Sequence, residues 1–143
     1  MLKKLCKILL AGAALLAGAV VLPFLLGPAA DDLALGRYRS EVLENLALPP
    51  GTGVVEVVSG CGNTSGTGNH TELYVGILVK TSLSEEAWAA LCPDSRSVSA
   101  QGPDTPAMGG LGLSFAQLET AEGVYILEFS TPAPFSDFDL RGH

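Results

Sequence analysis

The first thirty residues form one long apolar segment. Residues 8–30 hold twenty-three consecutive positions without a charge. About twenty helical residues cross the hydrocarbon core of a bilayer, and residues 8–26 come close to that length. Pro23 lies near the end of this stretch, where a membrane helix tolerates a kink. Gly27-Pro28 is expected to end the helix. The pattern therefore predicts a transmembrane anchor within residues 1–30.

After residue 30, the apolar positions recur at spacings of three and four. The stripe consists of Leu35, Tyr38, Val42 and Leu46. This spacing predicts an amphipathic helix over residues 31–48. Asp31 or Asp32 is expected to cap the N-terminus of this helix, where a carboxylate also suits the helix dipole. Pro49-Pro50-Gly51 is expected to end it.

Three runs rich in β-branched and aromatic residues predict strands at 54–59, 73–80 and 124–130. Residues 60–71 separate the first two runs and are mostly Gly, Asn, Ser and Thr. The simplest topology is therefore a hairpin with a long loop, and loops of this length are often functional or mobile. Glu122-Gly123 predicts a turn just before the third strand.

A second, shorter helix is predicted over residues 82–91. Ser84 is a favourable N-cap, and the two glutamates that follow it suit the helix dipole. Leu83 and Trp88 then stand at the two positions of a hydrophobic staple. Pro93 is expected to end the helix.

The remaining segments carry weaker patterns. Residues 96–112 are rich in Ser, Gly and Pro, and they predict a connecting loop with one short strand near 97–99. Residues 113–119 fit either a strand or a helical turn. The tail, residues 132–143, contains Phe135 and Phe138 and is expected to lie against the domain.

This order of elements predicts an α+β fold that follows the transmembrane helix. We expect a small antiparallel or mixed sheet of three or four strands, with two helices packed on one face. Residues 31–143 are enough for one small domain and too few for two.

The charges are distributed unevenly between the two parts. Lys3, Lys4 and Lys7 precede the apolar segment, and five basic and fifteen acidic residues follow it, a formal charge of −10. Since positive residues flank the cytoplasmic side of a membrane helix, the sequence predicts a single-pass protein of the cell membrane with residues 31–143 outside. Cleavage as a signal peptide, followed by secretion, is the alternative.

An acidic domain repels phosphates, so nucleic-acid binding is not expected.

Two of the three cysteines, Cys61 and Cys92, lie in the predicted outer domain. Disulfides persist outside the cytoplasm, and a bridge between these two would stabilise the fold by about 3 kcal/mol. The sequence therefore favours a structural disulfide, and free thiols are the alternative. A two-cysteine metal site would need companion ligands within a few residues, and neither cysteine has them.

The long loop is the candidate ligand site. Its candidate residues are Gly62, Asn63, Gly66, Gly68, Asn69 and His70. A phosphate-binding loop would also need a following helix and a lysine, and a strand follows here instead. His70 and His143 could share a metal ion with nearby acidic residues only if the fold brought them together. No spacing matches a catalytic, cofactor-binding or metal-binding motif, so none is predicted.

Four segments of the outer domain also carry a resemblance. They are LPPGT before the first strand, GNTSGTGNH in the loop, LVKTSLSEE leading into the helix and PFSDFDLRGH at the end. Over residues 45–143 this combination resembles a group of small bacterial proteins that are exported or membrane-anchored and have no established activity. The resemblance implies export and one compact α+β domain, and it implies no catalytic residue.

These observations support three functional hypotheses. The first is a non-enzymatic, membrane-anchored module that binds an envelope protein or a peptide outside the cytoplasm. The second is a sensor domain that binds a metal or small ligand through His70 and nearby groups. The third is an exported hydrolase or thiol enzyme, in which an unpaired Cys61 would act as nucleophile with His70 as base.

Overall fold

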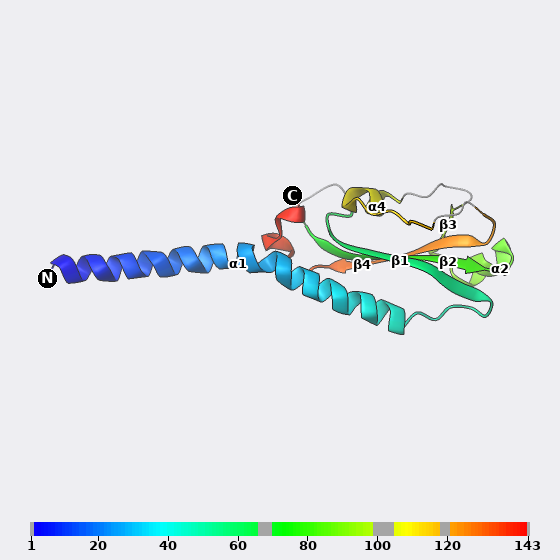
Figure 1. Ribbon diagram of the computed structural model, residues 1–143, viewed down its shortest axis with the longest axis horizontal. Helices are drawn as coiled ribbons and strands as arrows, with labels where there is room; N and C mark the ends of the chain where they lie inside the picture. Colours follow the sequence, from blue (N-terminus) through cyan, green and yellow to red (C-terminus); the bar gives the residue numbers. More distant parts are fainter. Residues whose placement is uncertain (1, 66–69, 99–104, 118–120, 143) are drawn as a thin grey trace.

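The computed structural model describes residues 2–65, 70–98, 105–117 and 121–142. Its elements are α1 (Leu2–Glu44), β1 (Thr52–Gly62), β2 (Glu72–Thr81), α2 (Glu85–Leu91), β3 (Arg96–Ser97), α4 (Pro106–Leu111), β4 (Val124–Pro132) and two short 3-10 helices, η1 (Ser136–Phe138) and η2 (Leu140–Gly142). A long apolar helix thus leads into a four-stranded antiparallel sheet with further helices (Figure 1). The predicted α+β class is confirmed.

Helix α1 is a single helix of 43 residues that contains both Pro23 and Pro28. The prediction that Gly27-Pro28 ends the helix is therefore wrong, and so is the prediction that Asp31 or Asp32 begins a new one. Two alanines directly after Pro28 favour helix, and packing of the second half of α1 on the sheet stabilises it further. The helix changes direction about midway along its length (Figure 1), as proline kinks lead one to expect.

The first half of α1 extends away from the rest of the molecule (Figure 1). From Leu9 onward, the helix contains a window with a mean hydropathy of 2.5 in which no residue is buried. The helix is therefore long and apolar enough to cross a membrane, a property that membrane anchors share with signal sequences.

The sheet has the strand order β1-β2-β4-β3. β1 and β2 form the predicted hairpin, and their register places Cys61 opposite Leu73. Both strands are longer than predicted, which leaves residues 63–71 as the loop. β2 lies between β1 and β4 and is buried from Leu73 to Val79, because helices and loops cover both of its faces.

One face of the sheet is covered by α1 and α2, as predicted. A buried cluster on this face, the Trp88 cluster, consists of Val75, Ile77, Val79, Trp88, Tyr125 and Leu127. Tyr38 and Val42 of α1 pack against it, and so does Leu83, which confirms the hydrophobic staple. Ser84 caps α2 as expected, since its side chain accepts a hydrogen bond from the Ala87 N–H. Trp88 stacks on Tyr125 with ring centroids 4.8 Å apart.

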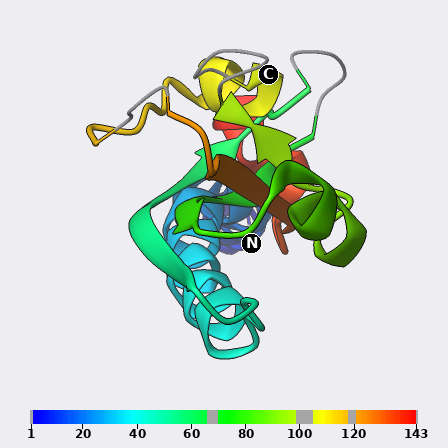
Figure 2. The same cartoon turned by 90° about the vertical axis from the view of Figure 1, so that its right-hand side faces the viewer.

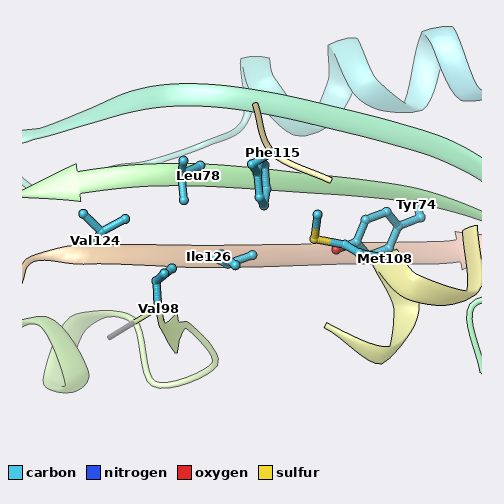
Figure 3. Packing of buried hydrophobic residues seen from close by; sticks show 7 residues of the cluster. All are labelled: Tyr74, Leu78, Val98, Met108, Phe115, Val124 and Ile126. Atoms are coloured by element: carbon cyan, nitrogen blue, oxygen red, sulfur yellow. The ribbon is translucent and has the colours of Figure 1, made fainter. Parts of the chain in front are cut away.

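The opposite face is covered by α4 and the segment that follows it. Figure 3 shows the buried Met108 cluster there, which consists of Tyr74, Leu78, Val98, Met108, Phe115, Val124 and Ile126. The sequence predicted a loop where α4 occurs. Thr105 caps this helix and Gly112 ends it in the left-handed conformation. Helices therefore lie on both sides of the sheet (Figure 2).

Candidate functional site

A groove of about 600 Å³ lies on the face of the sheet that α1 and α2 share. Its floor is formed by Leu127 and Phe129 of β4. One wall comes from α1 and the segment after it, with Tyr38, Val42, Leu46 and Leu48, and the other from residues 91–95 at the end of α2. Apolar side chains from three separate segments of the chain thus line one open depression.

The same stretch of β4 has an unpaired edge. β3 pairs with β4 only through Arg96 opposite Ile126 and Ser97 opposite Tyr125. Beyond Ile126, no strand in the described ranges pairs with β4 on the side away from β2. Residues 128–132 are exposed or half-buried. Because main-chain groups point alternately to the two sides of an antiparallel strand, every second residue of this stretch directs its main-chain groups toward the open side, beside the groove.

The charged residues that line the groove are all acidic. They are Glu41 on α1, Asp94 after α2 and Glu128 on β4. The Glu128 carboxylate lies on the other face of the sheet, where it accepts a hydrogen bond of 2.8 Å from the Tyr74 hydroxyl, so Glu41 and Asp94 supply the acidic side chains of the groove itself. A ligand with positive charge and apolar side chains would match this lining.

A second group of polar residues, the acid cluster, lies where α1 meets the C-terminal tail. It consists of Asp31, Asp32, Cys61, Asp139 and Arg141. Asp31 and Asp139 are fully buried. The Arg141 Nε donates to both oxygens of Asp139, at 2.9 and 3.0 Å, and its Nη1 donates to Asp32 at 2.6 Å. One guanidinium thus connects the tail to α1.

The two buried carboxyl groups have opposite pKa shifts. Hydrogen bonds from Arg141 lower the pKa of Asp139. Burial raises the pKa of Asp31, and the neighbouring Asp139 charge raises it further, although a hydrogen bond from the Phe135 N–H opposes the shift. Burial also raises the pKa of the Cys61 thiol to about 11. Arg141 therefore keeps Asp139 ionised, the surroundings of Asp31 favour its protonated form, and Cys61 holds its proton at neutral pH.

Three residues of the acid cluster could bind a metal ion. Donor atoms of Asp31, Cys61 and Asp139 all lie within 4.8 Å of one another. These residues come from α1, β1 and the tail, and they are far apart in the sequence. Because no short spacing connects them, sequence motifs predicted no metal ligands here.

Cys61 and Cys92 are free in the structure, so the disulfide that the sequence favoured is not formed. Cys61 lies near the end of β1 in the acid cluster, whereas Cys92 caps α2 and packs against the Trp88 cluster. The two thiols therefore have different surroundings. Cys92 also lines the groove.

The predicted ligand loop presents no convergent site in its described part. Gly62 ends β1 close to Leu111 of α4, and the Asn63 side chain accepts hydrogen bonds from Ser65. The Nε2 of His70 lies 3.9 Å from a Glu72 oxygen, and Glu72 also accepts a hydrogen bond from Thr64. The other candidates, Gly66, Gly68 and Asn69, lie outside the described residues, as does His143.

A scan against protein-family models and searches of curated proteins and of solved structures found no match. Three features of the structure bear on function: the groove, the open edge of β4 and the acid cluster. Sequence reasoning missed all three features. The pairing of β4 and the position of the tail depend on contacts between residues far apart in the chain.

Proposed function

We propose that this chain is a non-enzymatic, membrane-anchored binding module whose outer domain holds an extended peptide segment of another exported protein. The observation that carries the proposal is the coincidence of the open β4 edge with the apolar groove. A peptide that pairs with residues 128–132 would gain main-chain hydrogen bonds from the edge. Every second side chain of that peptide would point into the groove, because side chains alternate along a strand.

The lining of the groove specifies the chemistry of the peptide. Leu127 and Phe129 on the floor favour apolar side chains at alternate positions. Glu41 and Asp94 at the rim favour Lys or Arg at the positions between or beside them. The domain as a whole has ten more acidic than basic residues, which would also attract a basic segment and speed its association.

The proposed location depends on the N-terminal helix. Its length and apolar composition support a retained anchor, and the three lysines before it support a cytoplasmic N-terminus with the domain outside. The resemblance to exported bacterial proteins agrees with this location. Continuity of α1 through both prolines supports retention as well, because the anchor and the helix that packs on the sheet are one element.

The proposal can be tested with the full chain in lipid nanodiscs and a displayed library of short random peptides. We expect enrichment of peptides with alternating apolar residues and at least one basic residue. Phe129→Ala should then weaken binding of an enriched peptide about tenfold or more, since it removes an aromatic contact from the floor of the groove. Circular dichroism of the variant would verify that it is folded.

Two charge reversals on α1 provide a matched pair. Glu41 lines the groove, whereas Glu44, one turn further along the same helix, does not. Glu41→Lys should weaken binding about fivefold at low salt, and Glu44→Lys should change it little. Failure to enrich any peptide above empty nanodiscs would contradict the proposal. Equal binding by wild type, Phe129→Ala and Glu41→Lys would contradict it too.

A further inference from the structure

We infer that the acid cluster is a zinc site in which Asp31, Cys61 and Asp139 are the protein ligands. The site is separate from the groove, and the inference does not depend on peptide binding. Donor atoms of the three residues lie within 4.8 Å of one another. Tetrahedral zinc with bonds of about 2.0 Å to oxygen and 2.3 Å to sulfur needs donor separations of roughly 3.3–3.8 Å. Since 4.8 Å is an upper limit on these separations, a contraction of at most about 1.5 Å would complete the geometry.

The strongest indication of a ligand is an oxygen atom of Asp31. This side chain is fully buried, and its Oδ1 accepts a hydrogen bond of 3.0 Å from the Phe135 N–H. The other oxygen, Oδ2, is buried and receives no hydrogen bond from an N–H or O–H of the described residues, and the Asp31 carboxyl is in hydrogen-bonding contact with that of Asp139, so either a proton or a cation is needed between the two carboxyl groups. Leaving a buried polar atom without a partner is costly, so such an atom beside two further donors indicates that something binds there.

The charge balance of the cluster also favours a cation. Three carboxyl groups, those of Asp31, Asp32 and Asp139, face the single guanidinium of Arg141. When all three are ionised, the cluster is short of positive charge. The main-chain N–H and the guanidinium of Arg141 already donate four hydrogen bonds to the two Asp139 oxygens, so the ion would have to displace one of them to bind Asp139. A positively charged partner of this kind orients a ligating carboxylate from outside the coordination sphere.

The donor set identifies the kind of metal. Calcium and magnesium prefer sites built only from oxygen, whereas zinc accepts thiolate sulfur together with carboxylate oxygen. Three protein ligands leave the fourth tetrahedral position for a water molecule. Binding would displace the thiol proton of Cys61 and any proton that Asp31 holds. The ion would then join α1, β1 and the C-terminal tail at one point.

Alkylation provides the most direct test because the protein contains its own control. The untagged full chain is prepared in detergent micelles, reduced, and freed of metal with a chelator. It is then treated with iodoacetamide, either with or without added Zn²⁺. We expect Zn²⁺ to slow alkylation of Cys61 about tenfold or more and to leave Cys92 in the same molecule unchanged. Mass spectrometry measures both sites. Equal protection of both cysteines, or of neither, would overturn the inference.

Cobalt substitution tests the ligands individually. Co²⁺ added to the metal-free chain should give a thiolate-to-cobalt charge-transfer band that Zn²⁺ removes. Cys61→Ser should abolish the band, Cys92→Ser should retain it, and Asp31→Asn should weaken Co²⁺ binding by about 100-fold. The wild-type titration alone decides the matter if a variant does not fold. Absence of a band in wild type, or a band that needs Cys92 instead, would show that the cluster holds only protons.

Discussion

Arg141 donates a hydrogen bond of 2.6 Å from its Nη1 to Oδ1 of Asp32, which connects two residues 109 positions apart. The same guanidinium donates to the carbonyl oxygen of Pro28 at 3.1 Å, and it is paired with the buried Asp139. The C-terminal tail is therefore attached to α1 just beyond the apolar half of the helix. This attachment helps to explain why the helix continues where the sequence predicted its end.

Removing the guanidinium should destabilise the domain formed by the sheet and the helices packed on it. Arg141→Gln leaves the buried Asp139 carboxylate without its ionic partner, and we expect a loss of about 2 kcal/mol in the free energy of unfolding. Chemical denaturation of the full chain in micelles, followed by Trp88 fluorescence, measures this loss. Arg37→Gln, an exposed change on α1, is the control and should cost less than about 0.5 kcal/mol. Equal stabilities of the two variants would contradict a role for Arg141 in holding the tail.

Asp31 should give the metal-free protein a measurable dependence on pH. Because its pKa is raised in the folded state, its contribution to stability is complete below the pKa of unfolded Asp. That contribution is lost as the pH rises through the folded pKa. The contribution of Asp139 to stability has the opposite pH dependence. Because its pKa is lowered in the folded state, that contribution is lost as the pH falls. The Asp31→Asn variant retains the Asp139 effect, so comparison with wild type isolates Asp31.

We expect Asp31→Asn to be at least as stable as wild type at neutral pH, in the presence of chelator. The amide keeps an acceptor for the Phe135 N–H and cannot ionise. The stability difference in favour of the variant should increase from pH values near the ordinary Asp pKa toward neutrality. Thermal unfolding across this range tests the expectation. A variant that is less stable by the same amount at every pH would show that Asp31 is not the titrating group.

Gly123 in the turn before β4 should not tolerate a side chain. Its φ of +79° lies in the left-handed region, and an added Cβ would stand 2.5 Å from the Thr81 carbonyl oxygen. Gly123→Ala should therefore destabilise the domain by about 2 kcal/mol. Gly53→Ala in β1 is the matched control, because an added Cβ there meets no atom within 4 Å. Thermal unfolding measures both variants, and equal midpoints would contradict the assigned turn geometry.

The sequence predicted the elements whose signals are local. Ser84 and Leu83 mark the start of α2 through capping and packing with residues only a few positions away, and both assignments are confirmed. Gly123 likewise marks the turn before β4. The strand patterns at 54–59, 73–80 and 124–130 were correct because β-branched and aromatic residues dominate them. α4 had a local signal too, since Thr105, Pro106 and Gly112 stand at typical cap positions, but its two glycines concealed the helix.

The features on which function depends could not be predicted in this way. Asp31 reads as an N-cap in the sequence, yet it is buried within α1 against a tail that begins a hundred residues later. The open edge of β4 depends on how few residues of β3 pair with it, and strand pairing has no signature in one sequence. The groove depends on the path of α1 across the sheet. Contacts distant in the chain decide all three.

Hydrogen exchange along β4 tests the central claim of a peptide-binding edge most directly. Exchange is measured for the full chain in nanodiscs, alone and with a saturating peptide selected on it. It is followed at the backbone amides of residues 128–131 and, as an internal control, at those of β1. We predict slower exchange at amides of 128–131 whose N–H groups face away from β2, with β1, at the opposite edge of the sheet, unchanged. Unchanged exchange at 128–131 with the peptide bound, or protection confined to β1, would contradict the account.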